Sequence, residues 1–84
     1  MLEVTEKILA SINAKPMKKG EIYELPYLKT ISDYGIEWSL SELVRKGFVV
    51  ETCYAKNPRN GCQAFKYKAS KSGVRYLSEH GYLD

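Results

Sequence analysis

The sequence is poor in the residues that mark several common classes of protein. It has two cysteines, one histidine and no apolar run long enough to span a membrane. A secreted domain of 84 residues usually carries more cysteines than this. Residues 1–4 also lack the basic and apolar segments of a signal peptide. We therefore expect a cytoplasmic protein with no membrane contact, in which Cys53 and Cys62 are reduced thiols.

Groups that carry catalysis or hold metal ions are equally scarce. Zinc usually takes four ligands, and the two cysteines together with His80 fall short of that set. The sequence contains no phosphate-cradling glycine motif, no nucleophile elbow and no paired histidines. A chain of this size also leaves little room for a substrate cleft. We expect a protein that is not an enzyme and that needs no cofactor and no metal.

What the sequence does contain is typical of one small globular domain. The length allows a single domain, 1–84, and 44% of the residues are apolar while 27% are charged. The net charge is +3, with 13 basic residues against 10 acidic ones. This mild excess permits a polyanionic partner without requiring one.

The first predicted helix covers residues 4–14. Ile8, Leu9 and Ile12 recur at helical spacing and form one apolar stripe. The residue before Pro16 avoids the helical region of backbone conformation, so the helix is expected to end just before it.

Two further helices are expected before the middle of the chain. A short one is predicted over 19–25, and Pro26 breaks it or starts a new turn. A longer one is predicted over 33–46, with Ser32 as its N-cap and Gly47 free to turn left-handed after it. The inward-facing residues of these two helices are Ile22, Leu25, Ile36, Leu40, Leu43 and Val44.

A β-hairpin follows. Residues 48–55 are rich in β-branched and aromatic side chains, 62–69 alternate apolar with basic ones, and 57–61 carry strong turn signals. In this hairpin Cys53 and Cys62 do not face each other, and bridging requires Cα atoms within roughly 7 Å, so no disulfide is expected. The apolar side of the returning strand consists of Phe65, Tyr67 and Ala69, and its basic side of Lys66 and Lys68.

The last predicted helix covers residues 71–80. Ser70 is its expected N-cap, Val74 and Leu77 face inward, and Gly81 terminates it. The order helix, helix, helix, strand, strand, helix defines a compact, layered α+β unit.

Four stretches carry a resemblance to a known family. Glu24-Leu25 ends the second helix, Ile31-Ser32 turns into the third, Gly47-Phe48-Val49 opens the hairpin, and residues 67–73 lead into the last helix. Together they resemble the winged helix-turn-helix domains of small bacterial, archaeal and phage transcription regulators. The resemblance implies a three-helix core with a β-hairpin wing and a C-terminal helix. Pro26 departs from the pattern, because it falls where that family has the middle of the second helix.

The resemblance also implies that the third helix is a recognition helix that enters the major groove of double-stranded DNA. That helix is poor in the basic and amide side chains that usually read guanine and adenine. Glu37 could accept from cytosine, although it would repel phosphates. In the alternative interpretation, Trp38 packs partly against the wing or a partner and its neighbours are solvated. The exposed positions implied by the family are Tyr34, Gly35, Glu37, Trp38 and Ser41.

Basic residues outside the recognition helix are candidates for holding the phosphate backbone. Lys56 and Arg59 flank the hairpin tip, where an arginine can enter a narrow minor groove. Lys18 and Lys19 precede the second helix, whose free amides could hold a phosphate. Alternatively, these are a solvated turn and loop, with lysines that protect an edge strand from pairing. The candidate DNA-contacting residues are Lys18, Lys19, Tyr34, Glu37, Trp38, Ser41, Lys56, Arg59, Asn60, Lys66 and Lys68.

We interpret the chain as a double-stranded DNA-binding module, either a small transcription regulator or a phage or mobile-element control protein. The resemblance implies that it acts as a homodimer. A different class of function is a protein-interaction adaptor, which the weak net charge favours, as do the aromatic residues Tyr27, Tyr34 and Trp38. A third alternative is binding of RNA or single strands through stacked aromatic side chains.

Overall fold

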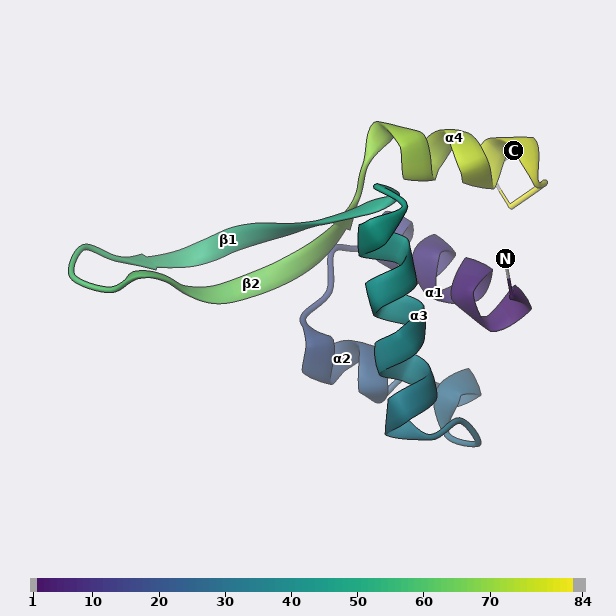
Figure 1. Cartoon of the computed structure of the whole chain (residues 1–84), viewed down its shortest axis with the longest axis horizontal. Coiled ribbons are helices and arrows are strands. Elements are labelled where there is room, and N and C mark those ends of the chain that lie inside the picture. The colour runs from purple at the N-terminus through teal and green to yellow at the C-terminus, as the bar shows by residue number, and fades with distance from the viewer. Residues whose placement is uncertain (1, 83–84) are drawn as a thin grey trace.

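The chain folds in the predicted order of helices, hairpin and last helix (Figure 1). The structure is a computed structural model that describes residues 2–82, apart from the side chain of Gln63. Its elements are α1 (Glu3–Ala14), α2 (Lys19–Tyr23), the 3-10 helix η1 (Pro26–Leu28), α3 (Asp33–Arg45), β1 (Val49–Asn57), β2 (Gly61–Ala69) and α4 (Lys71–Glu79). The predicted α+β class and its wing are confirmed.

The helix between α1 and α3 is shorter than expected. α2 ends at Tyr23 rather than at Leu25, and a separate turn of 3-10 helix begins at Pro26. Proline has no N–H to continue the helix, but its fixed φ suits the first position of a new helical turn. Leu28 then closes that turn by donating its N–H to the Leu25 carbonyl, at 3.0 Å.

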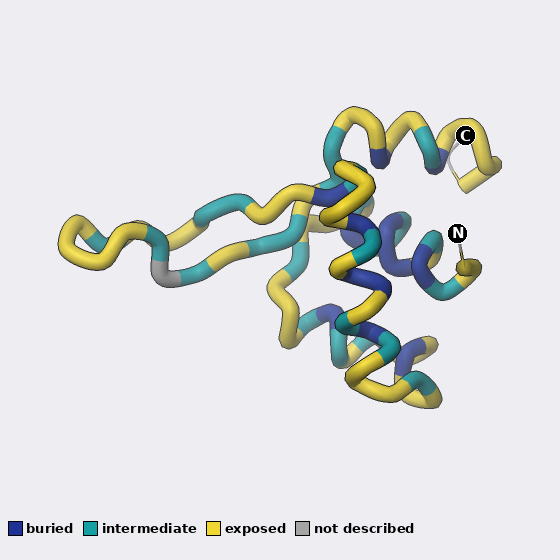
Figure 2. The backbone as a smooth tube through the Cα atoms, viewed as in Figure 1, coloured by how far each residue is buried: buried dark blue, intermediate teal, exposed yellow. Residues whose placement is uncertain are grey.

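The core is built around α1. Ile8, Leu9 and Ile12 are fully buried, and the helix that carries them contacts α3, α4 and β2. Figure 2 shows buried segments on each helix and at the base of the hairpin, while most of the hairpin beyond that base is exposed. The other elements contribute Ile22, Leu28, Ile36, Leu40, Leu43, Val49 and Leu77 to this core.

Two valines predicted to face inward are exposed instead. Val44 of α3 and Val74 of α4 each keep more than a third of their surface accessible to solvent. On α3, Ser39 is buried instead of Val44, and its hydroxyl accepts a hydrogen bond from the Thr5 hydroxyl at 3.1 Å. In α4 it is taken by Gly73, which is buried. Apolar spacing alone gives the rotation of a helix only to within about one residue, and packing decides the rest.

Both predicted serine N-caps and the left-handed glycine are confirmed. The Ser32 hydroxyl accepts from the Gly35 N–H at 3.2 Å, and the Ser70 hydroxyl accepts from the Gly73 N–H at 3.1 Å. Ser70 also donates to the Gly47 carbonyl at 2.5 Å, and Gly47 has a φ of 77°. The two ends of the hairpin are therefore joined directly to each other and to the helices on either side.

β1 and β2 form a two-stranded antiparallel sheet that extends nearer to the turn than predicted. Met17 adds an isolated bridge to the side of β2, with hydrogen bonds of 3.1 and 2.7 Å to Tyr67. Phe65, expected on the apolar side of the strand, is exposed because it lies beyond the core. At the tip, Gly61 takes a φ of 74°, and the Asn57 side chain accepts from the Arg59 N–H at 2.8 Å.

The close packing of α4 against the start of the hairpin gives the first testable prediction. A Cβ on Gly73 would lie 2.1 Å from the Phe48 carbonyl oxygen, which is a backbone atom that cannot move aside cheaply. Gly73→Ala is expected to lower the free energy of unfolding by roughly 1–3 kcal/mol through overpacking. Chemical denaturation followed by circular dichroism measures this loss.

Gly20→Ala provides the matched control. Gly20 lies in α2, and an added Cβ there would have no neighbouring atom within 4 Å, so alanine should be neutral or slightly stabilising. If both variants unfold with the same stability as the parent, α4 does not pack on the hairpin as described.

Candidate nucleic-acid interface

The outer face of α3 presents two aromatic side chains to solvent. Tyr34 is 80% exposed and Trp38 is 45% exposed, and Ser41 lies exposed one turn further along the helix. Trp38, Ser41 and Arg45 line one shallow concavity together with Glu42, whose carboxylate is ion-paired with Arg45. The inner face of α3 is in the core, so this outer face is free to contact a partner.

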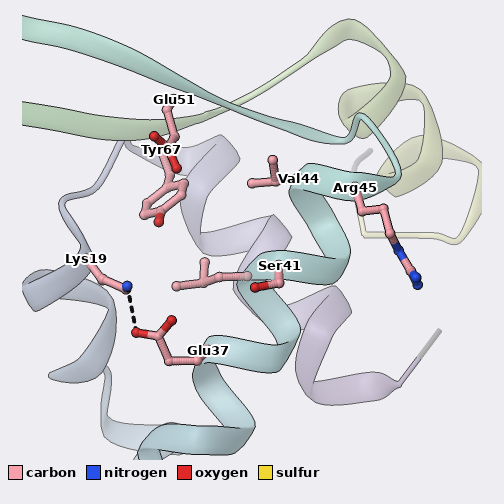
Figure 3. Close-up of a pocket in the computed structure, with 8 residues that line it drawn as sticks. Lys19, Glu37, Ser41, Val44, Arg45, Glu51 and Tyr67 are labelled. Atoms are coloured by element: carbon pink, nitrogen blue, oxygen red, sulfur yellow. Dashed lines mark ion pairs between the residues drawn. The ribbon is translucent and has the colours of Figure 1, made fainter.

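Glu37 is not a free carboxylate. It accepts a hydrogen bond from the Tyr23 hydroxyl and forms an ion pair with Lys19, whose Nζ lies 2.6 Å from Glu37 Oε1 (Figure 3). Lys19 and Tyr23 hold the pKa of Glu37 below its usual range, and Glu37 in turn raises the pKa of Lys19. Two of the predicted DNA contacts, Lys19 and Glu37, thus engage each other, and the negative charge on α3 is partly neutralised.

A concavity of about 390 Å³ lies between α2, α3 and the sheet (Figure 3). Tyr67 points into it from β2 and Glu51 lines it from β1, while Val44 lines it from α3. Val44 is exposed because its side chain forms part of the wall of this groove. The full lining is Lys19, Glu37, Leu40, Ser41, Val44, Arg45, Glu51 and Tyr67.

The tip of the hairpin carries the predicted cations far from the core (Figures 1 and 2). Lys56, Arg59 and Asn60 are all exposed. Among the described residues, neither Lys56 nor Arg59 is ion-paired with a carboxylate. These charges are therefore available to an anionic partner.

Lys66 and Lys18 meet at an aromatic side chain that the sequence pattern did not single out. Their ammonium groups lie 4.9 Å and 5.0 Å from the centre of the Tyr54 ring. A cation over an aromatic face is attracted by the ring quadrupole. Lys68, two residues along β2, lines a separate groove beside α4. The sequence pattern could not show this contact: the ladder partner of Lys66 is Thr52, Tyr54 falls in an irregular stretch of the register, and the approach of Lys18 depends on the tertiary fold.

The two cysteines form a disulfide, so the expectation of two reduced thiols is wrong. The Cα atoms of Cys53 and Cys62 are 5.8 Å apart. The ladder pairs Cys53 with Phe65 and Lys56 with Cys62, but its register is irregular between residues 53 and 56. A bulge of this kind changes which side chains meet across a hairpin, and the sequence pattern predicts only the regular register.

With this geometry the fold is that of a winged-helix domain, as the sequence predicted. The structure is similar to the crystal structure of ZitR, a zinc-responsive MarR family member from Lactococcus lactis, with a TM-score of 0.72 and 16% identity. The likeness covers 98% of this chain and 52% of that chain, so the chain spans about half the length of ZitR. At this identity the likeness shows the fold alone.

The other comparisons add no relative. No protein-family model matches the sequence, and no curated protein matches it. ZitR responds to zinc, whereas the described residues of this chain include no group of three or more His, Cys, Asp or Glu side chains placed to hold a metal ion. Within residues 2–82 no helix is long and apolar enough to cross a membrane.

The contact between Tyr23 and Glu37 predicts a measurable titration. Hydrogen bonding to Glu37 raises the pKa of Tyr23 from 10.0 to about 12. Because the folded-state pKa lies above the unfolded one, the contact stabilises the fold fully below pH 10.0 and ceases to do so as the pH rises through about 12. In Glu37→Gln the Tyr23 pKa should fall toward its ordinary value, as followed by NMR shifts of the tyrosine rings.

Tyr76 serves as the internal control for that titration. Burial, together with hydrogen bonding to Glu6, raises its pKa to about 12 as well. Glu37→Gln should leave Tyr76 unchanged, and Glu6→Gln should lower the pKa of Tyr76 in part while leaving Tyr23 unchanged. A Tyr23 pKa that does not respond to Glu37→Gln would show that the two side chains are not in contact.

The disulfide predicts a loss of stability on reduction. A link between cysteines nine positions apart restricts the unfolded chain, and chain entropy puts the effect at roughly 2–3 kcal/mol. Denaturation of the parent with and without a reducing agent measures it. The double variant Cys53→Ser/Cys62→Ser should match the reduced parent under both conditions. Equal stability of the oxidised and reduced parent would contradict the pairing.

Proposed function

We propose that the chain binds double-stranded DNA as a small transcription regulator, with α3 in the major groove and the hairpin on the flanking backbone. The observation that carries this proposal is that the winged-helix fold buries some faces of its helices and leaves the two DNA-contacting elements exposed. α1, α4 and the inner face of α3 form the core, while the outer face of α3 and the tip of the hairpin remain exposed. A recognition helix and a wing need this exposure.

The exposed side chains of α3 are better suited to hydrogen bonds and apolar contacts with bases than to charge interactions with phosphates. The hydroxyls of Tyr34 and Ser41 can donate to or accept from base edges, and the ring of Trp38 can contact a thymine methyl group. Pairing with Lys19 reduces the repulsion that Glu37 would exert on phosphates. We therefore expect modest base discrimination from α3, with Trp38 the main contributor.

The wing supplies the electrostatic part of the proposed binding. Lys56 and Arg59 project from a hairpin with nine residues in each strand, so they lie well away from α3 and can reach the neighbouring groove or backbone. Arginine fits a narrow minor groove, where the negative potential is strongest. Asn60, beside them, can bind a phosphate oxygen through its amide.

The proposal includes assembly as a homodimer. The N- and C-terminal helices lie side by side at the end of the molecule opposite the wing (Figure 1). A two-fold pair formed through this end would leave both wings and both α3 helices free to bind half-sites about one DNA turn apart. Analytical ultracentrifugation would report that state directly.

A protein-interaction adaptor is the second candidate function, favoured by the exposure of Tyr34 and Trp38. Aromatic side chains of this kind are enriched at protein interfaces. The sequence placed Tyr27 in the same group, but its hydroxyl is already hydrogen-bonded within the fold. That hydroxyl contacts the Ser11 hydroxyl at 2.6 Å and donates to the Lys7 carbonyl at 3.0 Å. Tyr34 and Trp38 are also more exposed than Tyr27, so we place the adaptor surface on the outer face of α3.

Binding to a mixed-sequence duplex at several salt concentrations tests the DNA proposal. Fluorescence anisotropy should show affinity that falls steeply as salt rises, because phosphate contacts release counterions. Arg59→Ala should weaken binding uniformly and reduce the log–log salt slope by about 1. Arg75→Ala is the matched control, since Arg75 is an exposed arginine of α4 already paired with Glu79.

Three outcomes separate the candidates. No binding at low salt, even at high protein concentration, refutes the DNA proposal. Binding that Arg59→Ala and Arg75→Ala affect equally refutes the role of the wing. If the parent binds no DNA but self-associates or captures a protein in a manner that Trp38→Ala abolishes, the adaptor function is supported instead.

A further inference from the structure

The two faces of the hairpin carry different charges. Side chains alternate along a strand, so residues on either side of Tyr67 face away from the groove that Tyr67 enters. Glu51 and Tyr67 line the groove against α3. Lys66 and Lys68 flank Tyr67 in sequence, and Lys68 lines the other groove, of about 490 Å³, beside α4. That second groove also includes Val50, Thr52, Lys71 and Val74.

Lys18 extends the basic face across a third segment. Met17 is bridged to Tyr67, so the next residue along the chain lies beside Lys66. The Tyr54 ring then brings the two ammonium groups together, because both lie within about 5 Å of its centre. Both ammonium groups therefore add to the positive charge of this face.

Among the described residues, no lysine of this face is held in a direct ion pair. The ion pairs of residues 2–82 engage Lys7, Lys19, Arg45, Lys46 and Arg75, and none engages a lysine of this face. Glu21 lies nearby, and its carboxylate accepts from the Lys18 backbone N–H at 3.0 Å. That hydrogen bond and the charges of neighbouring lysines, Lys18 and Lys66 among them, lower the pKa of Glu21, so this one carboxylate offsets part of the positive charge. We call the lysines without a direct ion pair the α4-side lysine strip; it consists of Lys18, Lys66, Lys68 and Lys71.

We propose that the α4-side lysine strip binds the phosphate backbone of a second segment of double-stranded DNA, distinct from the segment docked against α3. The inference rests on the proposed DNA binding. It reassigns Lys18, Lys66 and Lys68, which the sequence predicted as contacts to the duplex docked against α3, to the second duplex. The strip and the outer face of α3 lie on opposite sides of the sheet, and a duplex is stiff over the dimensions of this molecule, 43 × 29 × 20 Å. One straight duplex cannot contact both, so one protein molecule bridges two.

The charges favour a polyanion on this face over an apolar partner. The net charge of the chain is only +3, yet four lysines without carboxylate partners among the described residues gather here. Tyr54 is a positioning residue for two of them, because its ring attracts the ammonium groups of both Lys18 and Lys66 to the same part of this face. Lys66 and Lys68, two residues apart on one face of β2, can follow a repeating phosphate backbone.

Bridging is measured with two short duplexes of the same sequence, one carrying a donor dye and the other an acceptor. The intact protein should first bind one duplex, seen by anisotropy, and then bring donor and acceptor together, seen by energy transfer. Lys66→Gln/Lys68→Gln should leave the first binding within about twofold and weaken bridging on the order of tenfold or more. Tyr54→Phe should keep the bridging that Tyr54→Leu reduces, because phenylalanine retains the ring.

The matched control is Lys7→Gln/Lys46→Gln, which removes two lysines already paired with Glu3 and Glu42 and should leave both signals unchanged. Melting curves of each variant confirm that it is folded.

Bridging that persists in Lys66→Gln/Lys68→Gln overturns the inference and assigns bridging to a dimer with two α3 faces. Loss of the first binding in that variant also overturns it, because the strip then contacts the same duplex as α3. Absence of any binding by the parent refutes the proposed function and the inference with it.

Discussion

The core of the structure depends on the packing around α1. Ile8, Leu9 and Ile12 are fully buried, and through them α1 contacts α3, α4 and the base of β2. A chain of 84 residues forms only a small core, and among the described residues that core is one cluster of ten buried apolar side chains. The outer face of α3 and the distal hairpin are exposed as a consequence, and the proposed function uses those same surfaces.

The distal hairpin is held by local contacts in place of a core. Cys53 and Cys62 are bonded across the strands, and the ring of Tyr54 attracts Lys18 and Lys66 from neighbouring segments. These contacts order the wing without covering it, which leaves its cations accessible to an anionic partner. The sheet also has two unlike faces, because Glu51 lines the groove against α3 whereas lysines line the groove beside α4.

Features set by neighbouring residues were predictable from the sequence, and features set by distant contacts were not. The serine caps, the turn before Gly61 and the apolar stripe of α1 each depend on a few adjacent positions, and all three are confirmed. The exposure of Val74 follows from the close approach of Gly73 to the hairpin, which no periodicity shows. The disulfide depends on an irregular register, and the pairing of Glu37 with Lys19 depends on how α2 lies against α3.

The central proposal, that α3 and the hairpin tip together bind DNA, is tested most directly by mapping the contact residue by residue. Backbone amide NMR shifts of the isotopically labelled chain would be followed during titration with a short duplex. The largest changes are predicted at exposed residues of α3, including Tyr34 and Trp38, and at the tip around Lys56 and Arg59. Changes confined to α1 and the C-terminal end of α4, or no changes at low salt, would contradict the proposal.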